Sequence, residues 1–146
     1  MQINNNKIPL LLESLILENK WTSLCTKNLS KILRSNNNHP QLYSFERMKR
    51  ETFDVISTIN EIGGNIFKGH HHNNIFPGKV LINNVILIGQ IEVEEPVALY
   101  YYDKNEPIVI HFADIDNFSG IWRKVASSFD EFYFKLANGI VDPNRS

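Results

Sequence analysis

The period of the apolar pattern changes near residue 80, and this change constrains the fold more than any other feature of the sequence. Before it, aliphatic residues recur at helical spacing in three segments, 8–16, 26–33 and 48–62. After it come β-branched apolar runs and, last, one more helical segment. Three helices, several strands and one helix predict an α+β fold in which the two kinds of element are segregated.

Residues at the ends of the helical segments support their bounds. Pro9 is placed in the first turn of the first helix, where its missing N–H costs nothing, and Thr26 can cap the second. Gly63-Gly64 supplies a left-handed stop for the third helix, which is the longest. Residues 42–45 leave a short strand and the lead into the third helix as open alternatives, and Trp21 is expected to return to the core.

Apolar runs at 80–82 and 85–88 predict strands, the second closed by Gly89 and buried on both faces. Residues 97–102 and 107–112 flank a polar turn and predict an antiparallel hairpin. The second half of the chain therefore forms the sheet.

Breakers and histidines between 65 and 79 predict an exposed connection ahead of these strands. Residues 121–125 predict one more short strand. Ser128 and Glu131 then form a capping box at the start of the last helix, and Gly139 is placed to end it.

Composition limits the class of protein. With 146 residues and 42% hydrophobic residues, the chain is expected to fold as one domain rather than remain disordered. Cys25 is the only cysteine, so no intrachain disulfide can form and a reducing compartment is the natural expectation. No secretory signal is visible and no apolar run approaches the roughly 20 residues that cross a bilayer, so we expect a cytoplasmic protein without a membrane partner.

Charge is unevenly distributed along the chain. The formal net charge of −1 argues against direct binding of nucleic acid, which calls for a broad basic surface. Residues 1–80 carry ten basic and six acidic residues, net +4, whereas residues 81–146 carry five basic and ten acidic residues, net −5. The second half can therefore present an acidic face, provided that its charges share one surface.

Motifs for catalysis, metals or cofactors are weak. The run His70-His71-His72 has the right ligand type for a metal, but adjacent loop residues rarely converge on one ion. Cys25 has no signature of a nucleophile around it, and Ser128 is explained as a helix cap. Gly63-Gly64 is not followed by the Lys-Ser or Lys-Thr of a phosphate-binding loop. We therefore expect no catalytic residue, no metal and no cofactor.

Acidic residues accompany the hairpin strands. If residues 91–94 are extended, Glu92 and Glu94 share one face of a strand, with Glu95 beside them. Asp103 lies in the hairpin turn, and one tyrosine of 100–102 should point outward beside the acids. Acids with an exposed tyrosine suggest a surface for a basic protein partner.

Three stretches together resemble the SUKH superfamily. They are Ile-Leu-Ile-Gly-Gln-Ile-Glu at 86–92, Pro-Val-Ala-Leu-Tyr-Tyr at 96–101 and Trp-Arg-Lys-Val-Ala-Ser-Ser-Phe-Asp-Glu-Phe at 122–132. In that family a strand ending in Ile-Gly, an acidic or polar loop, an apolar strand and the Ala-x-Ser-Phe-x-x-Phe helix start follow in this order. Residues 8–16, with Trp21 after them, are similar to the start of one bacterial branch. The family consists mostly of bacterial immunity proteins, which are related to a fungal regulator of cell-wall synthesis.

This resemblance implies a single domain over residues 1–146, with a mixed, largely antiparallel sheet flanked by helices. It implies no catalysis, no cofactor, and a groove or sheet face that binds and neutralises a cognate polymorphic toxin, often a nuclease. By charge and position, the candidate contact residues are Glu92, Glu94, Glu95, Tyr102 and Asp103.

Two other functions stay open at this point. A cytosolic regulatory or scaffold module could use the same fold with partners that are not toxins. A small enzyme would require the histidine loop to fold over the acidic segment and place His71 beside Glu94.

Overall fold

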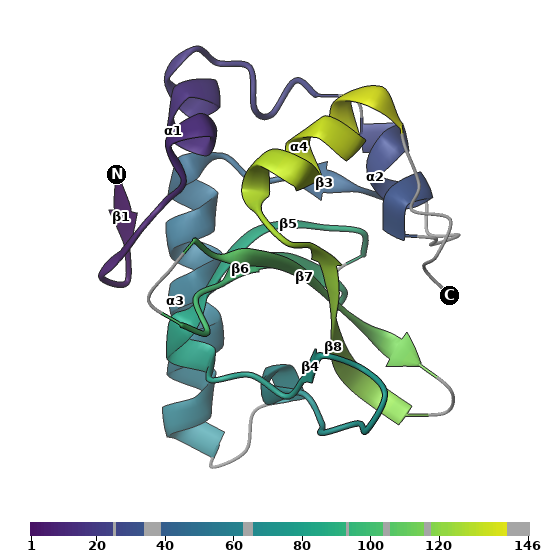
Figure 1. Ribbon diagram of the computed structural model, residues 1–146. Coiled ribbons are helices and arrows are strands. Elements are labelled where there is room, and N and C mark those ends of the chain that lie inside the picture. The colour runs from purple at the N-terminus through teal and green to yellow at the C-terminus, as the bar shows by residue number, and fades with distance from the viewer. Residues whose placement is uncertain are drawn as a thin grey trace.

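The computed structural model describes residues 1–24, 26–33, 39–62, 66–92, 94–103, 106–115 and 118–139. It has four α-helices and two antiparallel sheets, and the predicted α+β fold class is confirmed. Helix α3 runs along the side of the main sheet, whereas α1, α2 and α4 gather at one of its ends (Figure 1). None of the described helices is long and apolar enough to cross a bilayer.

The helices and 3-10 turns have the following bounds: α1 Leu10–Leu17, α2 Thr26–Leu33, α3 Phe45–Ile62, η1 Ile66–Lys68, η2 Ile82–Asn84 and α4 Phe129–Asn138. The strands are β1 Gln2–Ile3, β2 Asn6–Lys7, β3 Gln41–Leu42, β4 Pro77–Gly78, β5 Val85–Gln90, β6 Pro96–Tyr100, β7 Ile108–Ile115 and β8 Phe118–Ala126. Strands β1 and β2 form a separate hairpin. The main sheet has six strands in the order β3-β5-β6-β7-β8-β4, and every neighbouring pair is antiparallel.

Aromatic side chains fill two parts of the core, one against α4 and one at β7, β8 and η1. Trp21 is buried as expected, its ring centroid lies 5.6 Å from that of Phe129, and its Nε1–H donates to the carbonyl oxygen of Tyr43 at 2.9 Å. Trp122 is also fully buried, and its Nε1–H donates to the carbonyl oxygen of Phe67 at 2.7 Å. Both indoles therefore bury a large apolar area while keeping their single donor satisfied.

Several predicted elements are confirmed. Strand β5 is buried on both faces, and β6 and β7 form the antiparallel hairpin. In α4, the Ser128 hydroxyl accepts from the Glu131 N–H at 3.1 Å and Gly139 ends the helix with φ +65°. The returning bond of the capping box comes from the Ser127 N–H, which donates to the Glu131 carboxylate at 3.0 Å.

The first two helices and the 42–45 segment differ slightly from the prediction. Pro9 is the N-cap of α1 with ψ 143°, one position before the first turn. Thr26 is the first residue of α2, and Cys25 before it lies outside the described residues. Both alternatives for 42–45 are realised, because β3 ends at Leu42 and α3 begins at Phe45. Helix α3 is the longest described helix, whereas its predicted stop at residues 63–64 lies outside the described part.

The strand predicted at residues 80–82 is wrong. The Val80 N–H donates to the carbonyl oxygen of Lys68 and the Leu81 N–H donates to the Tyr100 hydroxyl, so neither joins a ladder. The Asn84 N–H closes a turn onto the Leu81 carbonyl, and η2 forms instead. Residue 89 does not close β5 either, because the strand continues to residue 90 past a bulge.

The segment 65–79 is not simply an exposed connection. Strand β4 pairs Pro77 with Arg123 and Gly78 with Trp122, which makes it the edge of the main sheet next to β8. Gly69 and Gly78 are buried, and a Cβ on Gly69 would lie 2.3 Å from the Gly78 carbonyl oxygen. This close approach requires glycine, which composition alone marks only as a breaker. Strand β8 spans nine residues, longer than the predicted 121–125.

The opposite edge of the sheet is closed by β3 and α3. The Tyr43 N–H donates to the carbonyl oxygen of Ile88 at 2.9 Å, just beyond β3. About two turns into α3, the Thr52 hydroxyl accepts from the Leu87 N–H at 3.0 Å. Main-chain donors and acceptors of β5 that face this edge are therefore taken up by short segments rather than by another long strand.

Arg47 fixes β3 in this position. Its guanidinium donates to the side-chain oxygens of Gln41 and Gln90, and it lies 4.3 Å from the ring centroid of Tyr43. The Tyr43 hydroxyl donates to the same Gln90 oxygen at 2.6 Å. Burial, with the Glu51 carboxylate adding to it and Arg47 opposing it, raises the pKa of Tyr43 to about 12.

Candidate functional site

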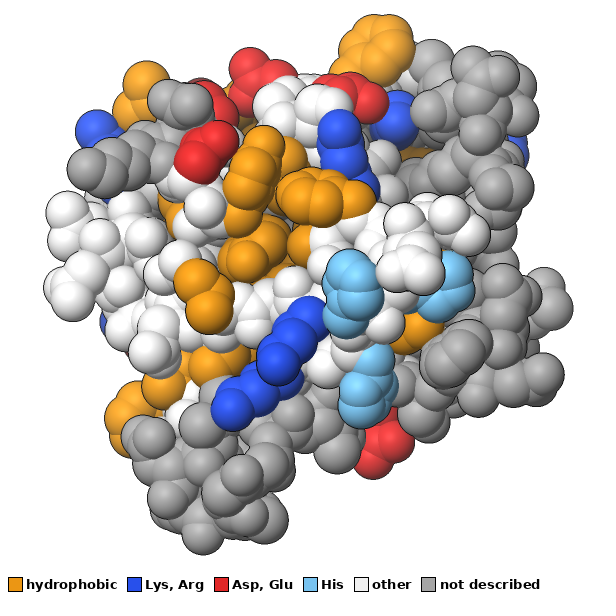
Figure 2. All heavy atoms as spheres, turned by 60° about the horizontal axis from the view of Figure 1, so that its bottom comes forward, with side chains coloured by type: hydrophobic (Ala, Val, Ile, Leu, Met, Phe, Trp, Pro, Cys, Tyr) orange, Lys and Arg blue, Asp and Glu red, His pale blue; other side chains and the backbone are white. Residues whose placement is uncertain are grey.

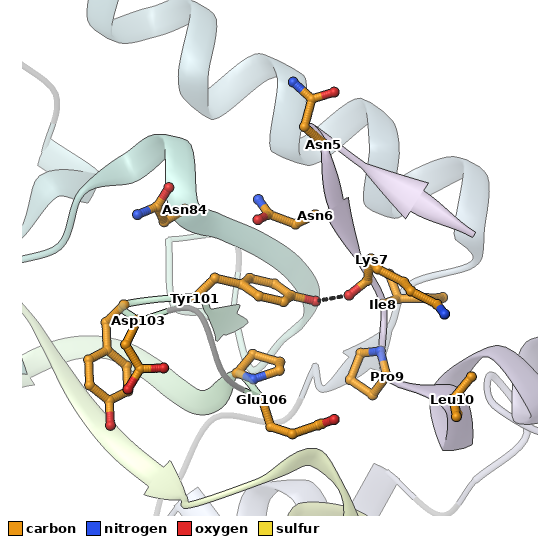
Figure 3. A pocket seen from close by; sticks show the side chains of 12 residues that line it. Asn5, Asn6, Lys7, Ile8, Pro9, Leu10, Asn84, Tyr101, Asp103 and Glu106 are labelled. Atoms are coloured by element: carbon orange, nitrogen blue, oxygen red, sulfur yellow. Dashed lines mark hydrogen bonds between the residues drawn. The ribbon is translucent and has the colours of Figure 1, made fainter.

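An open groove of about 860 Å³ lies between the β1–β2 hairpin and the chain that follows β6. Residues 5–10 form one wall, and residues 101–103 and 106–107 form the other, with Asn84 between them (Figure 3). Two residues predicted as partner contacts, Tyr102 and Asp103, line this groove.

The N-terminal hairpin that forms one wall is held by a small number of bonds. Asn4 and Asn5 have positive φ, 51° and 64°, as in the tight turn that matches the twist of a two-stranded hairpin. The Asn4 side-chain amide donates to the carbonyl oxygen of Asn83 at 2.7 Å. The Tyr101 hydroxyl donates to the carbonyl oxygen of Lys7 at 2.8 Å, across the groove (Figure 3).

Tyr101 also anchors the other wall. Its N–H donates to the carbonyl oxygen of Asn84 at 2.9 Å, so the chain before β5 and the chain after β6 meet at this residue. Burial, followed by the charge of Glu106, raises the pKa of Tyr101 well above its usual value. The phenol therefore stays protonated and keeps its role as donor to Lys7.

Carboxylates stand on the side of the groove opposite the hairpin. Asp103 and Glu106 are both exposed, and the Glu106 carboxylate extends toward the wall formed by Pro9 and Leu10 (Figure 3). Within the described part of the chain Lys7 forms no ion pair, so it does not neutralise Glu106. The groove is therefore polar, with an acidic side.

Exposed aromatic side chains continue the surface beyond the groove. Tyr102 is 47% exposed and Phe76 is 52% exposed, and their rings pack edge to face with centroids 5.5 Å apart. Tyr100 is buried, and its ring centroid lies 5.9 Å from that of Tyr102. The N–H of Leu81 donates to the Tyr100 hydroxyl, and the aliphatic Leu81 side chain is 68% exposed. We call these four residues the aromatic ridge. Figure 2 shows hydrophobic side chains gathered near the middle of this face, with histidine side chains beside them.

The structure does not bring the five predicted contact residues together. Glu92, Glu94 and Glu95 lie in the turn between β5 and β6, whereas Tyr102 and Asp103 follow the other end of β6. Six residues of extended chain separate the two groups, which corresponds to about 20 Å. The predicted contact residues therefore form two separate acidic groups, one at each end of β6, and not a single patch.

The extended conformation considered for residues 91–94 is also wrong. The Glu95 N–H donates to the carbonyl oxygen of Glu92 at 3.0 Å, and the Ile91 N–H donates to the carbonyl oxygen of Glu95 at 3.1 Å. These bonds define a tight turn, so the glutamates do not alternate along a strand face. An exposed tyrosine does accompany acids, as expected, but Tyr102 lies beside Asp103 rather than beside this turn.

The histidine run lies in a turn ahead of β4. His71 Nε2 lies 3.3 Å from the Asn73 side-chain oxygen, and the Asn74 N–H donates to His72 Nδ1 at 3.1 Å. Among the described residues, no group of three or more His, Cys, Asp or Glu is placed to hold a metal ion. No hydrogen bond or ion pair joins His71 and Glu94 in the described part of the chain.

The hairpin part of the first wall is not predicted from the sequence, although the Asn4-Asn5 pair is a signal for a left-handed hairpin turn. The role of Tyr101 is not predicted either, because its bond to Lys7 links residues 94 positions apart. Such a contact has no local signature.

Comparisons of the chain with protein-family models, with curated proteins and with solved structures give no match.

Proposed function

We propose that this chain is a protein-binding module. Specifically, we propose a non-catalytic immunity protein that binds and neutralises a cognate polymorphic toxin, with a nuclease as the proposed toxin. The observation that carries the proposal is the position of the aromatic ridge beside the groove that Asp103 and Glu106 line. Exposed aromatic rings supply contact area at low entropy cost, and nearby carboxylates favour association with a basic surface.

Two further features support a toxin as the partner. The sequence stretches at 86–92, 96–101 and 122–132 resemble the SUKH superfamily, whose members are mostly immunity proteins. A nuclease domain must bind phosphate backbones and therefore carries positive charge, to which Asp103 and Glu106 are complementary.

The test is binding to the product of the gene next to the one that encodes this chain. Titration calorimetry of the two purified proteins, with a nuclease assay on the same mixture, is expected to show tight, salt-sensitive association and loss of nuclease activity. An unrelated nuclease serves as the specificity control. Binding without loss of toxic activity would instead support a regulatory or scaffold module of the same fold, and no binding would refute the immunity function.

A matched pair of variants locates the surface. Phe76→Ala removes an exposed ring from the aromatic ridge, whereas Phe134→Ala removes an equally exposed ring, 57% against 52%, from α4. Only the first is expected to weaken toxin binding, by about tenfold or more. Equal effects of both substitutions would show that the aromatic ridge is not a specific contact surface for the toxin.

A further inference from the structure

Of the two acidic ends of β6, the one with Asp103 lines the groove described above. The turn with Glu92, Glu94 and Glu95 contributes no residue to the groove, whereas Asp103 and Glu106 line it together with the exposed ring of Tyr102. Beside Asp103 and Glu106, the walls of the groove can flank a charged side chain of a partner. Enclosure matters, because ion pairs in contact with bulk water contribute little.

We propose, building on the proposed function, that the groove seats an extended basic segment of the partner protein. A lysine or arginine side chain of that segment lies between Asp103 and Glu106, and its aliphatic part packs on the Tyr102 ring. Long cationic side chains combine an apolar stem with a charged head, which fits a site that has an aromatic surface and carboxylates side by side.

The remaining lining suits a peptide main chain. Asn5, Asn6 and Asn84 all line the groove, and a side-chain amide offers both a donor and an acceptor. Main-chain N–H and C=O groups require both, whatever the sequence of the bound segment. Apolar contacts come from Pro9 and Leu10, of which Leu10 is 70% exposed in this structure.

The size of the groove agrees with such an occupant. Its volume of about 860 Å³ falls within the range of sites that enclose most of a small ligand, and it exceeds what a single side chain needs. The Tyr101–Lys7 hydrogen bond joins the two walls of the groove. A short segment can therefore enter without separating the hairpin from the body of the protein.

Short peptides test the inference without the toxin. Nuclear magnetic resonance spectra of the labelled full chain would be recorded with acetyl-Ala-Lys-Ala-Arg-Ala-amide and, as control, with acetyl-Ala-Gln-Ala-Gln-Ala-amide. The basic peptide is expected to shift the amide signals of residues 5–7, Asn84 and 101–103, and the neutral peptide is expected to shift them far less. Equal shifts with both peptides, or shifts scattered over the whole surface, would overturn the proposal.

Two double variants with the same change of charge provide the decisive comparison. Asp103→Asn with Glu106→Gln removes both carboxylates from the groove, whereas Glu92→Gln with Glu94→Gln removes two from the opposite turn. The first pair is expected to weaken binding of the basic peptide by roughly five- to thirtyfold, and the second by less than about twofold. Similar losses in both would mean that only overall charge matters. All four substitutions are at side chains with at least partial exposure and keep side-chain shape, and an unchanged amide spectrum of each free variant checks the fold.

The same variants separate this inference from the proposed function. If the neighbouring gene product binds and is inhibited, but only the Glu92/Glu94 variant weakens it, the immunity function stands and the groove is refuted as its contact site. If the basic peptide binds in the groove while the neighbouring gene product does not bind at all, the groove stands and the immunity function fails.

Discussion

Removing one oxygen atom should loosen the N-terminal hairpin without unfolding the domain. Tyr101→Phe deletes the hydroxyl that donates to the Lys7 carbonyl at 2.8 Å and leaves the ring in place. Water can reach this carbonyl, so the loss is that of an ordinary net hydrogen bond, about 0.5–1.5 kcal/mol. This corresponds to an increase of about two- to tenfold in the equilibrium constant for detachment of the hairpin.

Amide hydrogen exchange measures this equilibrium directly. A detached two-stranded hairpin is only marginally stable, so the Ile8 N–H, which donates to the Met1 carbonyl at 3.1 Å, becomes exposed when the hairpin leaves the body. Its exchange rate should rise two- to tenfold in Tyr101→Phe, whereas amides of β5 and β6 keep their rates. Tyr102→Phe removes the same atom from the neighbouring exposed ring and serves as the control. Unchanged exchange at Ile8, or equal acceleration in both variants, would refute the idea that this bond holds the hairpin.

Three further results are expected from the same structure. Gly69→Ala should lower the free energy of unfolding by roughly 2 kcal/mol or more, because φ is +78° and the new Cβ would meet the Gly78 carbonyl. Chemical denaturation measures this free energy, and a decrease of less than about 0.5 kcal/mol would contradict the prediction. Ser128→Ala should cost about 1 kcal/mol through the lost cap of α4, and Ser128→Asp should restore most of it. Because the folded pKa of Tyr43 is raised to about 12, the stability it contributes is complete below about pH 10 and is lost as the pH rises from 10 to 12. Tyr43→Phe should reduce the slope of the stability curve in that window but not abolish it, because the pKa of Tyr101 is raised as well; an unchanged slope would show that Tyr43 does not contribute.

The fold class and most long elements could be predicted because their signals are local. The helical spacing of 8–16 and the Ser128 capping box each depend on residues within a few positions of one another, and the β6–β7 hairpin depends on two adjoining strands. The errors arise where tertiary contacts outweigh local preference. Residues 80–82 have strand composition, but the Val80 N–H donates to the Lys68 carbonyl and the Leu81 N–H donates to the Tyr100 hydroxyl. Strand β4 forms in a glycine- and histidine-rich segment because it pairs with β8.

The candidate site could be predicted only in its chemistry. Composition indicated an exposed tyrosine near acids, and Tyr102 beside Asp103 and Glu106 has this arrangement. Its place could not be predicted, because the groove depends on a hairpin at the other end of the chain. The predicted grouping of Tyr102 and Asp103 with Glu92 is not formed, because the five residues of β6 lie between them. Proximity in the sequence does not imply a shared surface.

The two edge strands of the main sheet, β3 and β4, are only two residues long. This length bears on the tendency of the protein to aggregate at high concentration. A long unpaired edge is a template on which further chains polymerise into fibrils, but two-residue margins offer almost no length for such growth. Along β5, the hydroxyl of Thr52 and the backbone of Tyr43 occupy positions that an invading strand would need. The two-residue strands β3 and β4 themselves therefore give an added strand very little main chain to pair with, which disfavours growth of the sheet at these two margins.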